Sequence, residues 1–215
     1  MLIVDAETTS LTPEYEGGSG VIWELAIQNR STGAKFLWRM KPVTDIADPE
    51  ALEVGRYWER TRSMRHAKPE EIRARYGPHA DRDAPLMDVW NLAVQTRYQC
   101  WSNAADLACV LPGILADATI VAAVPSFDGR FLSAFLAHFG QPEQPWHYRV
   151  RCIQSIAYGY LCSSDNPGYG RPPIDASTDT LAEALGVDPN GFERHTADGD
   201  VAMAVAMLDV IEGAR

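Results

Sequence analysis

The sequence predicts one α/β domain with a mixed β-sheet. Three observations indicate this fold class: a length of 215 residues, an apolar content of 46%, and short apolar runs that alternate with segments of helical periodicity. The predicted order is a strand, a two-stranded hairpin, a helical region, a strand, a helix, a strand and two helices, which is typical of an α/β domain. Because no repeat and no long linker interrupts the chain, we expect residues 1–215 to form a single domain.

The first half of the chain is predicted to supply three strands and a charged helical region. Its first apolar run ends in acidic residues, which predicts a buried strand whose end opens on a site. A turn signal at 31–33 joins the next two strands into an antiparallel hairpin. The elements expected here are strands over 2–4, 21–28 and 34–40, and helices over 50–82, with breaks at Pro69 and Pro78, and over 86–98.

The second half is predicted to alternate strands and helices. A β-branched apolar run at 119–124 indicates a buried strand, and Pro112 is expected to kink or shorten the helix before it. The elements expected here are a helix from Ser102 or Asn103 toward Ala116, a strand over 119–124, a helix over 128–139, a strand and a helix within 149–162, a loop over 163–178, and helices over 181–185 and from Thr196 onward.

The charge of the chain is unevenly distributed. Its 19 basic and 29 acidic side chains give a net charge of −10, which by itself disfavours a phosphate backbone as partner. Residues 56–82, however, hold eight basic and four acidic side chains, a local net charge of +4, so that the remainder carries −14. This basic segment is either a solvated helical face or an arm that contacts substrate, for which Arg62 and Arg65 are our candidates.

The sequence offers no membrane or export signal. The longest apolar stretch, 105–124, carries Asp106, Pro112 and Asp117, whereas a membrane span needs roughly 18 uninterrupted apolar residues. The first residues lack the basic and apolar regions of a signal peptide. We therefore expect a cytoplasmic protein with no membrane partner. The spacing of its four cysteines matches no zinc knuckle or disulfide scaffold, and we expect buried thiols.

Asp5 and Glu7 follow the first apolar run directly. Residues i and i+2 of a strand project to the same side, so both carboxylates point into one space. Two neighbouring carboxylates repel each other, and both stay ionised only if a cation bridges them. The same pair would also be compatible with the solvated start of a loop.

Three more candidates lie farther along the chain. Asp128 follows the predicted strand at 119–124, at a helix N-terminus, where the helix dipole also favours an acidic residue. His195 and Asp200 are separated by about 140° on a helix, so they share a site only if His195 lies at or before the first turn. As a single histidine, His195 could equally be a capping or surface residue.

Taken together, these residues resemble the DEDDh class of 3′ to 5′ exonucleases, which includes proofreading exonuclease subunits and RNase T. The order and spacing of the motifs match. The resemblance rests on Asp-x-Glu-Thr-Thr-x-Leu at 5–11, a strand followed by Phe-Asp at 119–128, His-x4-Asp at 195–200, and similar segments at 21–26 and 181–187. It implies an RNase H-like fold, a mixed five-stranded sheet flanked by helices, with 56–82 as a helical basic insertion.

The resemblance also implies a metal site. Phosphodiester hydrolysis needs an activated water and neutralisation of the charge that develops on the phosphate and the leaving oxygen, and two divalent ions supply both. Mg²⁺ and Mn²⁺ prefer oxygen ligands. The family pattern assigns this role, for two Mg²⁺ or Mn²⁺ ions, to Asp5, Glu7, Asp128 and Asp200.

The remaining roles implied by the resemblance concern the water and the substrate. His195 would be the general base that takes a proton from the attacking water, a task suited to a histidine. By position, Thr8 would contact the terminal nucleotide and Leu11 would pack against its base.

The sequence departs from the family in three places. Ala123 and Val124 stand where relatives usually carry a His-Asn pair, and Gln154 lies near the position of an Asp in many relatives. Asp198 competes with Asp200 for the last ligand position, and Asp200 is chosen because the family spacing places it there. These departures bear on rate and substrate choice more than on the type of reaction.

The sequence therefore predicts a metal-dependent 3′ to 5′ exonuclease that releases nucleoside 5′-monophosphates from single-stranded or frayed DNA. An RNA-trimming exonuclease with the same chemistry stays open, because recognition of the 2′-OH depends on local geometry. A third reading is a non-catalytic nucleic-acid-binding module, suggested by Ala123 and Val124 but opposed by the retained acids. A homodimer also stays open, and nothing indicates a polymerase partner.

Overall fold

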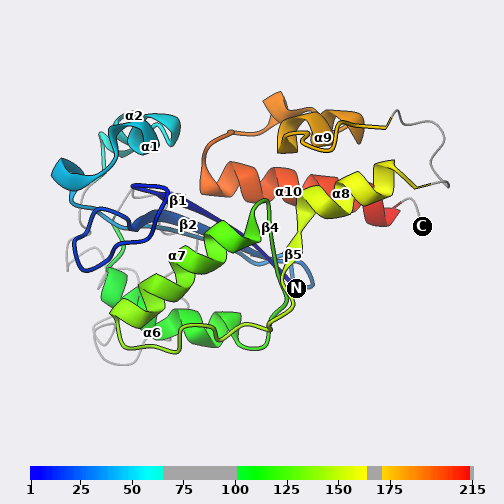
Figure 1. Ribbon diagram of the computed structural model, residues 1–215. Helices are drawn as coiled ribbons and strands as arrows, with labels where there is room; N and C mark the ends of the chain where they lie inside the picture. Colours follow the sequence, from blue (N-terminus) through cyan, green and yellow to red (C-terminus); the bar gives the residue numbers. More distant parts are fainter. Residues whose placement is uncertain (65–100, 164–170, 214–215) are drawn as a thin grey trace, which may run out of the picture.

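The structure is a computed structural model that describes residues 1–64, 101–163 and 171–213. Its centre is a five-stranded mixed sheet with the strand order β3-β2-β1-β4-β5 (Figure 1). The β1–β2 and β2–β3 pairs are antiparallel, and the β1–β4 and β4–β5 pairs are parallel. The mixed sheet confirms the predicted fold class. The strands are β1 Leu2–Thr8, β2 Ile22–Asn29, β3 Lys35–Arg39, β4 Ile120–Ala122 and β5 Arg151–Cys152.

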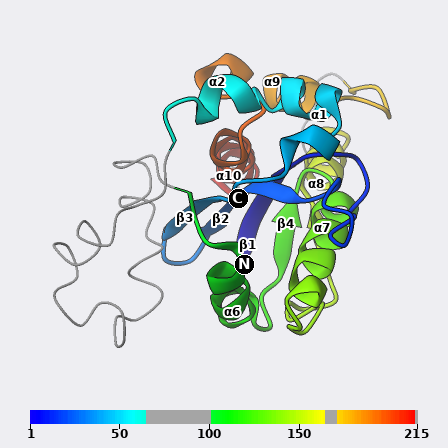
Figure 2. The same cartoon turned by 90° about the vertical axis from the view of Figure 1, so that its left-hand side faces the viewer.

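Helices cover both faces of this sheet. Helices α6 (Ala104–Leu115) and α7 (Pro125–His138) pack on one face, whereas α8 (Ile153–Leu161), α9 (Thr178–Ala184) and α10 (Ala197–Gly213) pack on the other (Figures 1 and 2). Two short helices lie on the α10 side, and two 3₁₀ turns occupy loops. These are α1 Pro49–Val54, α2 Tyr57–Thr61, Thr44–Ile46 and Pro189–Gly191.

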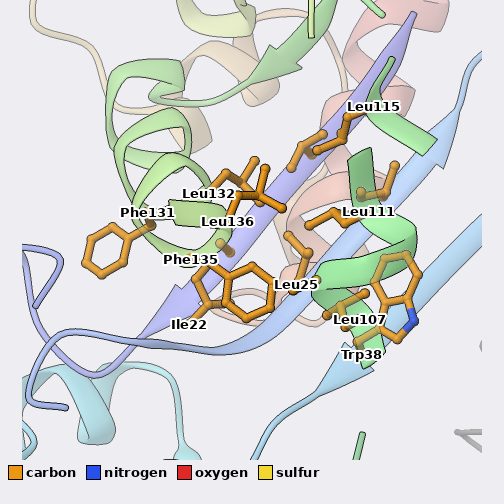
Figure 3. Packing of buried hydrophobic residues seen from close by; sticks show 14 of the residues in the cluster. Ile22, Leu25, Trp38, Leu107, Leu111, Leu115, Phe131, Leu132, Phe135 and Leu136 are labelled. Atoms are coloured by element: carbon orange, nitrogen blue, oxygen red, sulfur yellow. The ribbon is translucent and has the colours of Figure 1, made fainter. Parts of the chain in front are cut away.

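The core divides along the sheet because strand side chains alternate between faces. Leu2, Val4 and Ala6 of β1 belong to the cluster formed with α6 and α7, whereas Ile3 belongs to the cluster formed with α8, α9 and α10. Figure 3 shows the first cluster. Its labelled side chains, all buried, are Ile22, Leu25, Trp38, Leu107, Leu111, Leu115, Phe131, Leu132, Phe135 and Leu136.

Several element boundaries differ from the prediction. Strand β1 continues through Glu7 to Thr8, where the β1–β2 register shifts, so both acids lie within the strand. Helix α6 begins after Asn103, whose side chain accepts from two backbone N–H groups, and continues past Pro112 to Leu115. The proline therefore does not end this helix, because buried residues on both sides of it pack against the sheet.

Helices α7 and α9 begin earlier than predicted. Helix α7 starts at Pro125, since proline is well suited to the first helical position, and this places Asp128 within the first turn. Helix α9 starts at Thr178, because the Ser177 side chain caps it by accepting from the Thr180 N–H.

The basic segment is described only at its start. Helices α1 and α2 are helical as predicted, and a turn at Gly55 separates them. The expected breaks at Pro69 and Pro78 and the helix over 86–98 lie outside the described residues.

The expectation of buried thiols is wrong for Cys109, which lies on the solvent side of α6 and is exposed, while Cys152 and Cys162 are half-buried. All three are free. Within the described ranges, no helix combines the length and apolar character that crossing a membrane requires.

Candidate functional site

Three carboxylates converge where β1 meets the start of α10. Asp5, Glu7 and Asp200 each offer an oxygen atom, and these atoms all lie within 4.8 Å of one another. Asp5 and Glu7 share the β1 face that packs against α10, and Asp200 lies in the first turn of that helix. Asp198, the alternative to Asp200 in the sequence, does not belong to this group. The predicted convergence of strand and helix acids is therefore observed.

Asp128, the fourth predicted ligand, lies close enough to Asp5 to raise its pKa but is not one of the three acids that converge within 4.8 Å. It is buried in the first turn of α7, and its Oδ1 accepts a hydrogen bond of 3.1 Å from the backbone N–H of Ala6. Ala6 is the residue between the two β1 acids, so Asp128 fixes the strand that carries them. Burial raises the pKa of Asp128 to about 7, against the effect of the backbone hydrogen bonds to its carboxylate.

The acids of β1 also hold protons more tightly than ordinary carboxyl groups. Burial is the largest cause for both, and neighbouring carboxylates add to it. The pKa of Glu7 is raised to about 7, with Glu24 as the main charged contributor. The pKa of Asp5 is raised well above its ordinary value by burial, Asp128, Glu7 and Glu24. Such a cluster favours a bound cation, which would relieve the repulsion.

Arg194 supplies positive charge at the edge of the cluster. Its guanidinium forms an ion pair with Asp200 and a second one, at 2.7 Å, with Asp179 of α9. It thereby ties α9 to the start of α10, and it opposes the rise in the pKa of both β1 acids. Arg194 was not among the site residues predicted from the sequence. Its position directly before the His-x4-Asp motif was the available signal.

His195 lies in a tight turn directly before α10. Its backbone has a φ of 59°, in the left-handed region, and its side chain is exposed. The next residue, Thr196, closes the turn: its hydroxyl donates to the Glu193 carbonyl at 2.7 Å and accepts from the Gly199 N–H at 3.0 Å. Gly199 is required here, since a Cβ atom would lie 2.0 Å from that same carbonyl oxygen. His195 thus precedes the first turn of the helix, as the spacing required.

A pocket of about 250 Å³ opens next to Glu7. Thr8 and Leu11, the two predicted nucleotide contacts, both line it, and Leu11 is 72% exposed. The opposite wall comes from α1 and α7, with Ala51, Val54 and Phe127 among the lining residues. The pocket is mainly apolar and ends at a carboxylate of the cluster, so it can take a flat apolar group attached to a charged one.

The turn between α1 and α2 passes close to the same cluster. A Cβ atom on Gly55 would lie 3.2 Å from Oε2 of Glu7 and 3.0 Å from the ring of Trp23. Helix α2 follows, with Tyr57 buried edge-on against Trp23 at a centroid distance of 5.1 Å. The start of the basic segment is therefore packed over the acidic cluster.

The arginines of this part of the basic segment differ in their environments. Arg56 pairs with Glu59 at 2.6 Å and with Glu193 at 3.8 Å, and Arg60 pairs with the buried Glu24. Arg62 is exposed, which leaves it accessible to a ligand. Arg65, the other predicted substrate contact, lies outside the described residues.

Of the positions that depart from the family pattern, Ala123 borders the site. Ala123 lines a cavity of about 30 Å³ behind Asp5 and Asp200. Val124 precedes α7 without capping it and is 48% exposed. Gln154 donates a hydrogen bond of 2.6 Å to the hydroxyl of Thr178 at the start of α9. None of the three contributes a carboxylate to the cluster.

Solved structures of nucleases resemble this chain over nearly all of its length. A product-bound exonuclease I superposes with a TM-score of 0.59 and 16% identity, over 99% of this chain and 43% of its own. Exonuclease I from Methylocaldum szegediense has a TM-score of 0.59 and 12% identity, over 100% of this chain and 40% of its own. The nuclease domain of 3′hExo, a DEDDh family member bound to rAMP, has a TM-score of 0.47 and 14% identity, over 99% of this chain and 92% of its own.

No protein-family model matches the sequence, and no curated protein does. The chain spans less than half the length of the two exonuclease I structures. At these identities the likeness concerns the fold: the five-stranded mixed sheet and its flanking helices are an RNase H-like fold of the kind found in exonuclease I.

Proposed function

We propose that this protein is a metal-dependent 3′ to 5′ exonuclease of the DEDDh class that acts on single-stranded or frayed DNA. The observation that carries the proposal is the convergence of Asp5, Glu7 and Asp200 within 4.8 Å, with His195 directly before the helix that supplies Asp200. The fold shared with exonuclease I supports it. A protein that only bound nucleic acid would gain nothing from clustered negative charge facing a phosphate backbone.

The donor set of the cluster fits divalent cations. Its ligands are carboxylate oxygens, which Mg²⁺ and Mn²⁺ prefer. Burial is the largest cause of the raised pKa of Glu7, and the neighbouring Glu24 carboxylate adds to it, so a cation beside Glu7 would stabilise its ionised form. Asp5, Glu7 and Asp200 would hold the ions, with the second oxygen of Asp128 as a further ligand. When bound, two such ions would activate water and neutralise charge on the phosphate and the leaving 3′ oxygen.

Side chains of the protein itself would accept the proton and keep the metal ligands in position. His195, exposed and directly before the helix that supplies Asp200, would accept a proton from the attacking water at a ring nitrogen. Asp128 would keep β1 in place through the Ala6 N–H, so that both strand acids keep their orientation. The turn closed by Thr196 and Gly199 would fix the distance between His195 and Asp200.

The pocket beside Glu7 would receive the terminal nucleotide of the strand. Leu11, Val54 and Phe127 offer apolar surface to a base, and Thr8 lines the same pocket beside Glu7. This arrangement would place the last phosphodiester bond next to the carboxylates. We assign Arg62, which is exposed, to the phosphates farther from the 3′ end, and we propose the same role for Arg65 from its place in the basic segment of the sequence.

The experiment that tests the function uses single-stranded DNA and RNA of the same sequence, each labelled at the 5′ end. We expect stepwise shortening of the DNA from its 3′ end in Mg²⁺ or Mn²⁺, with nucleoside 5′-monophosphates as products and no cleavage in EDTA. The protein with Asp5→Asn, purified in the same way, controls for a contaminating nuclease.

The results of this experiment distinguish the proposed DNA exonuclease from the alternative functions. Faster shortening of RNA than of DNA would make the protein an RNA-trimming exonuclease with the same site. Binding of either polymer without shortening in either metal would favour the non-catalytic module. A labelled fragment from internal cleavage would contradict the exonuclease assignment.

A further inference from the structure

Glu24 of β2 is a buried carboxylate to which the proposed reaction assigns no role. Its side chain has no exposed surface, and in the antiparallel register it pairs with Glu7 on the neighbouring strand. A buried carboxylate needs charged or hydrogen-bonding partners. Glu24 has three: Arg39 at 2.6 Å, the guanidinium of Arg60, and the backbone N–H of Ala197 at 2.9 Å. Ala197 is the first residue of α10.

Arg60 connects this carboxylate to the turn that contains His195. Its side chain, from α2, is only 7% exposed and lies over the ring of Trp23 at 4.9 Å. Besides pairing with Glu24, its Nη1 donates to the carbonyl of Gly55 at 3.0 Å and to the carbonyl of His195 at 3.3 Å. One guanidinium therefore joins β2, the turn between α1 and α2, and the turn before α10.

The backbone around His195 is thus held at two points. Arg60 binds the carbonyl of His195, and Glu24 binds the N–H of Ala197, two residues later. The left-handed conformation of His195 is unfavourable for a residue other than glycine, so surrounding contacts must maintain it. The ring of His195 itself is exposed, so its position depends on its backbone rather than on side-chain packing.

We propose that Arg60 is a positioning residue that holds His195 in place for the reaction, with Glu24 as its buried anchor. The inference rests on the proposed function for the role of His195. It also assigns a purpose to the start of the basic segment. Arg60 belongs to that segment by sequence, but its low exposure and its partners direct it toward the site rather than toward a phosphate backbone.

The kinetic test compares Arg60→Met and Arg60→Lys with a matched control, Arg30→Met. Arg30 also joins two elements, through Asp209 at 2.6 Å and Glu212 at 2.8 Å, but it does so at the far end of α10. We expect Arg60→Met to lower kcat by roughly 10- to 100-fold with KM changed less than about twofold, since misplacing a catalytic group lowers the rate on this scale. Arg60→Lys should retain more of kcat, and Arg30→Met all of it.

A double-mutant cycle shows whether Arg60 acts through His195. In a His195→Ala background, Arg60→Met should lower the residual kcat no further, because the group that it positions is gone. An equal loss in both backgrounds would overturn the proposal. A rise in KM with kcat unchanged would also overturn it and would make Arg60 a substrate contact.

A second measurement does not depend on activity. The amide of Ala197 donates to buried Glu24, so its hydrogen exchange, followed by NMR, reports whether the turn is held. We expect exchange at Ala197 to rise at least tenfold in Arg60→Met and to stay unchanged in Arg30→Met, with Leu132 of α7 reporting global unfolding. Equal acceleration at Ala197 and Leu132 would mean a purely structural role. If the wild-type protein degrades no nucleic acid, the proposed function fails, while this exchange result still decides whether Arg60 holds the turn.

Discussion

The two faces of strand β1 differ in what they carry. Leu2, Val4 and Ala6 point to one face, and all three are buried in the cluster with α6 and α7. On the other face the buried Ile3 is followed by Asp5 and Glu7, which meet α10. The same strand therefore stabilises the fold through one face and gathers negative charge on the other.

This difference shows how the fold can tolerate a site in which buried carboxylates repel one another. The acids repel one another and are largely removed from water, which raises their pKa and disfavours the folded state when they are ionised. The apolar face, with aromatic residues such as Phe131 and Phe135 from α7, supplies the burial that offsets this cost. Changes on the two faces should therefore act on different properties.

The largest expected effect is that of Asp5→Asn on activity. Loss of one carboxylate from the cluster should lower kcat/KM by roughly 10³-fold or more, about 4 kcal/mol, because cation binding and charge neutralisation both weaken. In EDTA the same substitution should raise Tm, since it removes a buried charge from among its neighbours. Nuclease assays and thermal melts of the same preparation check both. A variant that loses activity together with its fold would contradict the division between the faces.

The converse change lies on the apolar face. Leu132→Ala removes a fully buried side chain of α7 and should lower the free energy of unfolding by roughly 2–5 kcal/mol. We expect kcat per folded molecule to stay unchanged at a temperature well below Tm, because Asp5, Glu7 and Asp200 lie on the opposite side of β1 and Asp128, one turn before Leu132, is held by the Ala6 N–H. Urea denaturation and single-turnover assays measure the two quantities. A fall in kcat at full folding would show that the faces are coupled.

Next in size is the dependence of stability on pH and metal. In the folded, metal-free protein the pKa of Glu7 and of Asp128 is about 7, whereas in the unfolded chain such groups titrate near about 4. Between these values the folded state binds more protons, so the stability contributed by these groups is greatest below pH ~4 and is lost as the pH rises through about 7.

Divalent metal should act in the opposite direction. At a concentration 100 times its Kd, Mg²⁺ should add about 2.7 kcal/mol, and the gain should be larger at pH 8 than at pH 5.5, because only ionised carboxylates bind it. Urea denaturation in EDTA and in Mg²⁺ at both values of pH measures this. Glu7→Gln should reduce both the pH dependence and the gain. Equal stabilisation at the two values of pH would count against a carboxylate site.

The sequence was most informative where a short-range rule applies. The i, i+2 alternation of a strand was enough to bring Asp5 and Glu7 together. The angle between His195 and Asp200 gave only a condition for a shared site, that the histidine lie at or before the first turn, and it does precede α10. The contacts of Arg194 and Glu24 could not be predicted from the order of residues along the chain, because their partners come from other elements.

One signal for Glu24 was nevertheless present in the sequence. It stands between Trp23 and Leu25 in an apolar run, and a carboxylate in a buried strand requires a cationic partner. Two arginines serve, Arg39 from the next strand and Arg60 from α2, and the second depends on how α2 packs over the sheet. That packing involves contacts across 36 positions of the chain, which local periodicity does not encode.

The smallest expected effect concerns the start of α7, the helix that packs on the apolar face of β1. Val124 precedes the helix in a non-helical conformation and offers no side-chain acceptor to its first N–H groups. Val124→Asn would supply one, and a cap of this type stabilises a protein by roughly 1 kcal/mol. Val124→Ala is the matched control, because it removes the same exposed valine without adding an acceptor. We expect the free energy of unfolding to rise in the first variant only.

The same substitution also bears on activity, since α7 positions Asp128 against Ala6. A more stable first turn should keep kcat at or above its original value. A gain in stability accompanied by a loss of activity would show that the site needs mobility at this helix end.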